Sequence, residues 1–102
     1  MVVNSSGYTP LFSATRSNSP DKVKLLLELG LDANKKSSRG NTPLSHAAKY
    51  SSSPEILTLL LDAGADAKVK DRYGKTALDY ATDKGRFKGT KEYWRLYYAT
   101  NE

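Results

Sequence analysis

The stretch GNTPL at residues 40–44 decides the fold, because the chain carries two further versions of it at nearly constant spacing. GYTPL occupies residues 7–11 and GKTAL occupies residues 74–78, so the steps are 33 and 34 residues. A second motif keeps the same phase, since PDKVKLLLELG at 20–30 matches PEILTLLLDAG at 54–64. Self-similarity at such a period indicates a repeat architecture in which each unit packs on its neighbours.

Each unit is predicted to form a helix, a turn, a second helix and an extended loop. Thr9 and Thr42 lie at N-cap positions, and each precedes a proline at the first helical position, where a missing N–H has no cost. Pro20 and Pro54 begin the second helices, each followed by an acidic residue that suits the helix dipole.

The second helices are predicted to end at glycines. Leucine triplets at residues 25–27 and 59–61 supply the buried stripe of each helix. Gly30 and Gly64 follow, where a left-handed backbone conformation terminates a helix. Polar loops rich in Lys, Arg, Ser and Asp then lead to the next unit.

These motifs resemble the ankyrin-repeat family, whose unit opens its first helix with the pattern T-P-L-H-x-A. The resemblance covers residues from about Asn4 to Gly85 and includes the Gly-Leu-Asp-Ala-Asn and Gly-Ala-Asp-Ala endings of the second helices. It implies an all-α fold, an ankyrin-repeat solenoid of helix-turn-helix units joined by extended hairpin-like loops. We expect residues 1–102 to form one domain, with repeat units at about 4–36, 37–70 and 71–102.

The chain departs from the family pattern at the histidine of T-P-L-H, which is replaced by Phe12, Ser45 and Asp79. The hydrogen bonds that this histidine usually gives between repeats therefore need another source. The third unit loses the pattern after residue 83, and residues 90–99 are predicted to form a last helix that caps the stack. We expect its aromatic residues to cover the helix of the 59–61 triplet rather than to form a binding patch; they are Tyr93, Trp94, Tyr97 and Tyr98.

The resemblance implies a non-catalytic protein–protein interaction module, which presents loop tips and first-helix faces to a protein partner. Tyr and Arg are also enriched among the residues that dominate interface energies. The alternative is that these are only solvated loop residues. Carried over position by position, the candidate protein-binding residues are Tyr8, Arg16, Arg39, Asn41, Lys49, Tyr50, Arg72, Tyr73, Lys75 and Asp83.

Composition speaks against an enzyme, a cofactor or a metal site. The absence of cysteine excludes a thiol nucleophile and a thiolate metal site, and a single histidine, His46, excludes zinc sites built on several imidazoles. Ser45 and His46 point about 100° apart on a helix, so they are not a nucleophile and its base. His46 is instead expected at the surface or partly buried. Residues 85–91, GRFKGTK, have the wrong order for a phosphate-binding loop.

The net charge of +5 predicts an acidic protein partner, but it leaves two alternatives open. One is a basic binder of nucleic acid or another polyanion, because basic residues recur in corresponding loops. The other is a structural segment excised from a larger ankyrin array, in which the aromatic end would meet a neighbouring repeat. The basic loop residues are Lys35, Lys36, Arg39, Lys68, Lys70, Arg72 and Lys75.

The sequence also leads to expectations about the cellular location and the oligomeric state of the protein. No apolar run approaches the roughly 18–20 residues of a membrane helix, and the first residues lack the basic start and apolar stretch of a signal peptide. We therefore expect a cytoplasmic or other intracellular protein, a monomer without membrane contact.

Overall fold

The computed structural model describes residues 9–51, 53–84, 87 and 89–101. No strand occurs within these ranges, so the predicted all-α repeat fold is confirmed. The helices are α1 (Pro10–Arg16), α2 (Pro20–Glu28), α3 (Pro43–Tyr50), α4 (Pro54–Asp62), α5 (Ala77–Lys84) and α6 (Lys91–Asn101).

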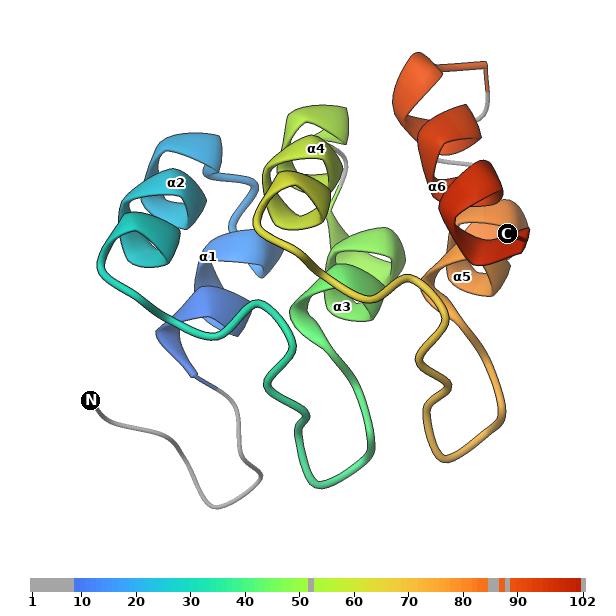
Figure 1. Cartoon of the computed structure of the whole chain (residues 1–102), viewed down its shortest axis with the longest axis horizontal. Coiled ribbons are helices and arrows are strands. Elements are labelled where there is room, and N and C mark those ends of the chain that lie inside the picture. The colour runs from blue at the N-terminus through green and yellow to red at the C-terminus, as the bar shows by residue number, and fades with distance from the viewer. Residues whose placement is uncertain (1–8, 52, 85–86, 88, 102) are drawn as a thin grey trace.

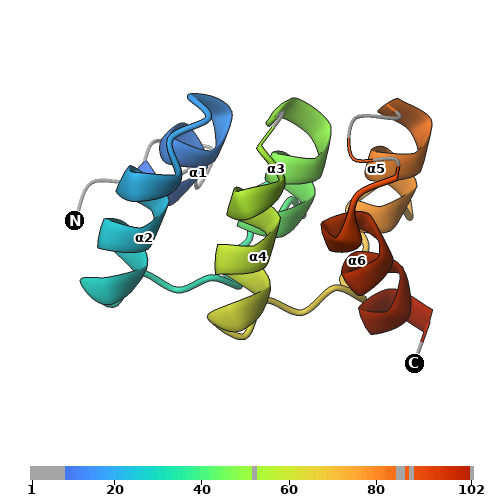
Figure 2. The ribbon, with the colours of Figure 1, turned by 90° about the horizontal axis from the view of Figure 1, so that it is seen from above.

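The helices form two parallel rows. The first helices of the units, α1, α3 and α5, make one row, and α2, α4 and α6 make the other (Figure 1). Seen from above, the second helices lie side by side, with α2 and α6 at opposite ends of the stack (Figure 2). Between units, the chain descends into hairpin loops beneath the first helices (Figure 1). The result is a two-layered solenoid in which each unit packs on its neighbours.

Two of the three replacements of the family's histidine close a capping box. The Thr42 N–H donates to Ser45 Oγ at 2.9 Å, and the Ser45 N–H donates to Thr42 Oγ1 at 3.2 Å. In the third unit the Thr76 N–H donates to Asp79 Oδ2 at 2.9 Å, and the Asp79 N–H donates to Thr76 Oγ1 at 3.3 Å. Ser45 and Asp79 therefore stabilise the helix starts from within their own units.

The first unit exchanges this cap for apolar packing. Phe12 stands at the corresponding position and is almost fully buried, with its ring meeting the His46 ring edge-on at 5.2 Å between centroids. A phenyl ring cannot close a capping box, and Thr9 Oγ1 is buried with no hydrogen-bond partner in the structure as described. Packing between α1 and α3 replaces the hydrogen bonds.

Successive units are joined where the second helices end. Gly30 and Gly64 adopt the predicted left-handed conformation, with φ of +95° and +91°. Beyond the first of them, the Asn34 side-chain amide donates to the Gly64 carbonyl at 3.0 Å and accepts from the Asp66 N–H at 2.7 Å. One side chain thus satisfies two backbone groups of the following unit and fixes the spacing between the units.

The core runs the length of the stack between the two rows of helices. Alanines on the first helices let the neighbouring backbones approach closely, while branched residues of the second helices fill the space above them. Its buried residues include Leu11, Ala14, Val23, Leu44, Ala47, Ala48, Ile56, Leu57, Leu60, Ala77, Ala81 and Leu96.

Helix α6 packs on α4 and α5 and begins within a residue of the predicted position. Its attachment uses Leu96, which is fully buried, and an ion pair of 2.7 Å between Arg95 and Asp62 of α4. Tyr93 is half-buried, and its hydroxyl lies 3.1 Å from Thr82 Oγ1 of α5. The helix therefore covers the C-terminal end of the core.

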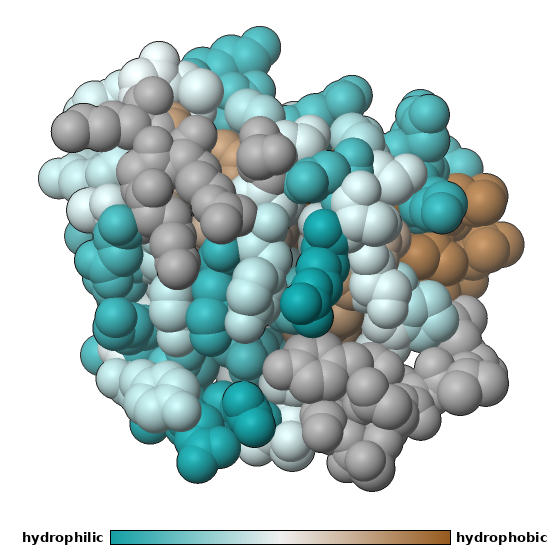
Figure 3. Space-filling view, turned by 180° about the vertical axis from the view of Figure 1, so that it is seen from behind, coloured by the Kyte–Doolittle hydropathy of each residue, from teal (hydrophilic) through white to brown (hydrophobic). Residues whose placement is uncertain are grey.

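The expectation that the aromatic residues of this helix cover α4 was wrong for three of them. Trp94, Tyr97 and Tyr98 are exposed, because the buried position of α6 is taken by Leu96. At the opposite end of the stack, Leu25 of α2 and Leu29, the C-cap residue of that helix, are exposed as well. An apolar patch is visible over that N-terminal end, where α2 lies (Figure 3).

Candidate functional site

Cations and aromatic rings alternate across the first helices. Arg16 is the last residue of α1, and Tyr50 is the last residue of α3. The Arg16 guanidinium carbon lies 5.2 Å from the centroid of the Tyr50 ring. Lys49 Nζ lies 5.4 Å from the same centroid. Cation–π contacts of this kind contribute about 0.5–1 kcal/mol each at exposed sites. We call the surface made by Arg16, Lys49, Tyr50, Lys75 and Asp83 the first-helix face.

A second ring continues the row toward α5. Lys49 Nζ lies 5.1 Å and Lys75 Nζ lies 5.5 Å from the centroid of the Tyr80 ring. Tyr80 itself is buried, and its ring lies beneath the two ammonium groups. Three cations are thereby held at defined places, which lowers the entropy that they lose when a ligand binds.

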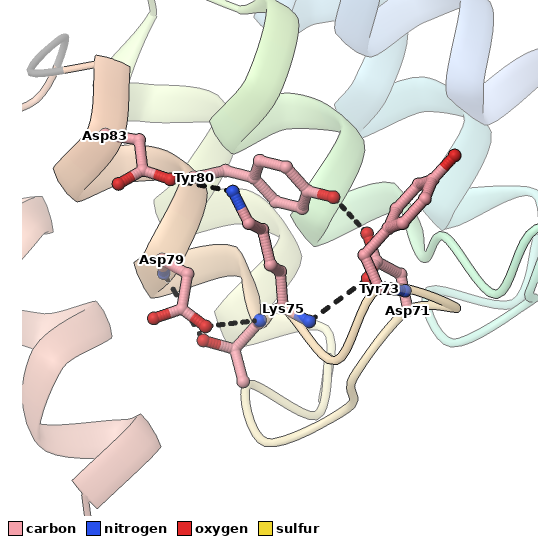
Figure 4. A network of polar contacts seen from close by, with 7 residues as sticks. Asp71, Tyr73, Lys75, Asp79, Tyr80 and Asp83 are labelled. Atoms are coloured by element: carbon pink, nitrogen blue, oxygen red, sulfur yellow. Dashed lines mark hydrogen bonds and ion pairs between the residues drawn. The ribbon is translucent and has the colours of Figure 1, made fainter.

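The hairpin at residues 71–75 is attached to Tyr80 by a hydrogen bond. The Tyr80 hydroxyl donates to the Asp71 carboxylate, whose Oδ1 also accepts from the backbone N–H groups of Tyr73 at 2.9 Å and Lys75 at 3.1 Å (Figure 4). Burial raises the pKa of Asp71, but these hydrogen bonds outweigh it and hold that pKa below its usual range. Burial and the same hydrogen bond raise the pKa of Tyr80. Asp71 is therefore an anchor of the loop.

Lys75 also contacts the last residue of the face. Its ammonium lies 3.1 Å from Asp83 Oδ2 (Figure 4). Both side chains are about half exposed, so the pair is worth little in water and opens readily. Lys75 is thus available to a ligand that offers a competing carboxylate.

His46 lies beneath the row, and the expectation of a surface or partly buried residue was wrong. It is 6% exposed and its ring packs between Phe12 and Tyr50, with centroids 5.2 Å and 4.7 Å away. Burial, together with the charges of Arg16 and Lys49, lowers the pKa of His46 to about 4. The imidazole is neutral at physiological pH and acts as part of the core.

The described residues bring together neither a serine–histidine pair nor a cluster of metal ligands. Ser45 is bonded within its capping box to Thr42 and does not pair with His46. Within the described ranges, no group of three or more His, Cys, Asp or Glu side chains is placed to hold a metal ion. None of the helices in that part of the chain is long and apolar enough to cross a membrane.

The tips of the two hairpins lie against each other. The Arg72 N–H donates to the Arg39 carbonyl at 3.2 Å. A Cβ at Gly40 would lie 3.3 Å from both Arg72 N and Asp71 Cα, so this close approach favours glycine, as does the φ of +79°. The side chains of Arg39, Arg72 and Tyr73 are exposed, and the Arg72 guanidinium carbon lies 5.5 Å from the Tyr73 ring centroid. Predicted residues from two units therefore share one edge.

Asn41 and Tyr8 are the predicted residues that the structure does not place on this surface. Asn41 is 6% exposed, and its backbone carbonyl closes a hairpin with the Ser37 N–H at 2.8 Å. Tyr8 lies outside the described residues. Tyr80 was not among the residues predicted from the sequence. Its position in the repeat could have indicated it, because Tyr80 follows Asp79 as His46 follows Ser45.

The remaining basic loop residues form a separate exposed group. Lys35, Lys36, Lys68 and Lys70 all reach solvent. The aspartates that precede them are engaged locally: Asp32 Oδ1 accepts from the Asn34 N–H at 2.8 Å and Asp66 Oδ1 from the Lys68 N–H at 2.9 Å. These aspartates remain exposed and carry negative charge within the group.

Sequence comparisons agree with this architecture. The model of a family described as "Ankyrin repeats (many copies)" matches residues 26–81, and one described as "Ankyrin repeat" matches residues 6–35. The mouse protein named Ankyrin repeat and MYND domain-containing protein 1 is 50% identical over 44 residues, which are 43% of this chain and 5% of that protein. The chain thus spans a small part of this relative.

Ankyrin repeats are in general protein–protein interaction modules and are typically non-catalytic. The first of these family models matches more than half of the chain, and the stack of paired helices agrees with it. The chain belongs to the ankyrin-repeat family.

Proposed function

We propose that this chain binds one protein partner through the first-helix face and the adjoining hairpin tips, without catalysis and without a cofactor. The observation that carries the proposal is the row of three cations, Arg16, Lys49 and Lys75, held over the rings of Tyr50 and Tyr80. Such a row presents charge in a fixed geometry from three successive units. The chain is expected to act as a monomer.

The partner segment is expected to be acidic. Asp71 is buried and its carboxylate is taken up by hydrogen bonds, while Asp83 is paired with Lys75. Arg16 and Lys49 contact the Tyr50 ring through their cationic groups, and these contacts leave the charge of both side chains available to a ligand. A complementary negative segment would associate faster and in one preferred register.

The hairpin tips would add affinity at one edge of the face. Arg72 and Tyr73 are exposed residues of the kinds that form hot spots, and the bond between the tips fixes their position relative to Arg39. A partner that covers this edge would also exclude water from the cation–tyrosine contacts, which strengthens them.

Binding of a labelled acidic peptide tests the proposal. Fluorescence anisotropy would compare a peptide of alternating glutamate and glycine with its glutamine counterpart. Arg16→Gln/Lys49→Gln is expected to weaken binding of the acidic peptide about tenfold. The matched control, Lys22→Gln/Lys24→Gln, removes the same charge from exposed positions of α2 and should leave binding nearly unchanged.

Two results would contradict the proposal. Equal losses in the two variants would show that only net charge matters, and equal binding of the glutamine peptide would remove the acidic partner. A single-stranded oligonucleotide provides the test of the polyanion alternative. Tighter binding of the oligonucleotide than of the peptide, falling log-linearly with salt, would favour that alternative.

A further inference from the structure

The chain itself places a carboxylate on the first-helix face. The Lys75 ammonium donates to Asp83 Oδ2 at 3.1 Å, and this ion pair joins the hairpin at 71–75 to the end of α5 (Figure 4). Arg16 and Lys49, the other two cations of the face, both contact the ring of Tyr50. The ion pair therefore shows where on this face a carboxylate binds a cation.

Lys75 is held in place at both its backbone and its ammonium. Its N–H donates to Asp71 Oδ1 at 3.1 Å, and its Nζ lies 5.5 Å from the centroid of the Tyr80 ring. The Tyr80 hydroxyl donates to the same Asp71 carboxylate, which fixes the hairpin relative to the ring. Lys49 Nζ adds a second positive charge 5.1 Å from the same centroid. An incoming carboxylate thus meets a site that needs little rearrangement.

The Asp83 carboxylate can leave this site at low cost. The side chains of Lys75 and Asp83 are 46% and 56% exposed, so water can replace the contact when the pair opens. Ion pairs with this exposure contribute little to stability. Asp83 also lies in the last turn of α5, where a negative charge opposes the helix dipole. The helix therefore does not depend on this carboxylate.

We propose that Lys75 binds a carboxylate of the partner and that Asp83 stands in for it in the free chain. This inference rests on the proposed function, because the ligand carboxylate belongs to the acidic partner segment. The sequence predicted Asp83 as a residue that contacts the partner. In this inference it is an internal competitor, which the partner displaces from Lys75 into solvent.

The competition makes Asp83 a determinant of specificity. An acidic segment that supplies a carboxylate at Lys75 replaces the lost ion pair with an equivalent one. A segment that carries its charge elsewhere meets an intact pair, whose carboxylate repels it. The face thereby distinguishes acidic partners by the position of their charge and not only by its amount.

Binding of the alternating glutamate–glycine peptide to Asp83→Asn tests this inference. Asparagine keeps the size of the side chain and removes its charge, so the affinity measured by fluorescence anisotropy should rise about two- to fivefold. The matched control is Asp62→Asn, because Asp62 of α4 also forms an exposed ion pair, with Arg95 of α6. It removes the same charge from the other row of helices, and its affinity should stay close to the native value.

A double-mutant cycle tests whether the effect acts through Lys75. Lys75→Gln should weaken binding of the peptide about two- to fivefold. Adding Asp83→Asn to that variant should raise the affinity much less than it does in the native chain, because the competition for the ammonium is gone. Urea unfolding of Asp83→Asn should give a stability close to native, which separates the loss of competition from a change in the fold.

Three results would overturn the inference while leaving the proposed function in place, provided that Arg16→Gln/Lys49→Gln still weakens binding. They are no gain in Asp83→Asn, equal gains in Asp83→Asn and Asp62→Asn, and a gain that persists in full beside Lys75→Gln. Equal binding of the acidic peptide and its glutamine counterpart, by the native chain and by Asp83→Asn alike, would overturn both proposals.

Discussion

The hairpins at residues 37–41 and 71–75 have the same backbone but different anchors. The Ser37 N–H donates to the Asn41 carbonyl at 2.8 Å, and the Asp71 N–H donates to the Lys75 carbonyl at 2.9 Å. Each hairpin carries a glycine with positive φ, of +79° in the first and +75° in the second. Backbone geometry is therefore conserved between the units of this chain, while the side chains that hold it differ.

The difference lies in how far each anchor reaches. The Ser37 hydroxyl accepts long bonds from the Arg39 and Asn41 N–H groups, at 3.4 Å and 3.3 Å. The Asp71 carboxylate makes the equivalent bonds at shorter distance and accepts from the Tyr80 hydroxyl as well. A carboxylate with two oxygens can thus hold its own turn and fasten it to the next helix, which a single hydroxyl does not do here.

Removing the two anchors is expected to have the largest and most unequal effect. Asp71→Ala should lower the free energy of unfolding by about 2–3 kcal/mol, because it leaves a buried hydroxyl and two N–H groups without their charged acceptor. Ser37→Ala should cost about 1 kcal/mol. Urea unfolding followed by circular dichroism measures both. Equal losses would mean that the tie to Tyr80 contributes nothing.

Substituting the two glycines should give a smaller difference in stability, and here the variant in the first hairpin should lose more. Gly40→Ala is expected to cost about 2 kcal/mol, because it combines positive φ with a Cβ contact of 3.3 Å to the backbone of the next hairpin. Gly74→Ala meets no atom within 4 Å and should cost about 1 kcal/mol from its φ alone. Urea unfolding of the two variants measures the difference. A larger loss in Gly74→Ala would contradict the close approach of the hairpins.

The smallest of the expected effects is a change in the pH dependence of stability when Asp71 is replaced. The pKa of Asp71 is depressed in the folded chain, so its contribution is complete above the pKa of the unfolded chain, about 3.9, and is lost as pH falls through the folded value. Native protein should therefore lose more stability than Asp71→Asn when pH falls from about 5 to about 3. The other carboxylates titrate in both proteins, so parallel curves would exclude the effect.

The helices and their order could be predicted from local signals. Thr-Pro pairs mark the starts of α1 and α3, and Gly30 and Gly64 end α2 and α4 in the expected conformation. The exposure of single side chains could not be predicted in the same way. Asn41 and Lys75 occupy equivalent places in the two hairpins, yet one is buried and the other is exposed. What covers a loop residue depends on the neighbouring unit.

The C-terminal helix shows the same limit. Its sequence offers several large apolar residues, and the one that is fully buried is Leu96, while the larger Trp94 and Tyr98 face solvent. Periodicity identifies residues that share a face of a helix, but it does not decide which face packs. The fit of α6 against α4 and α5, where Leu96 is buried, decides which face packs.

Residues close together in the chain were enough to predict the repeat, the helix boundaries, the glycine turns and the excess of positive charge. The folded structure was needed to show that Lys49 and Lys75 contact one buried ring, that Asp71 is an anchor, and that the ends of the stack expose apolar residues. These features depend on how the hairpin at 71–75 folds back on α5, how α3 packs on α5 and how α4 packs on α6, and local sequence patterns do not fix such packing.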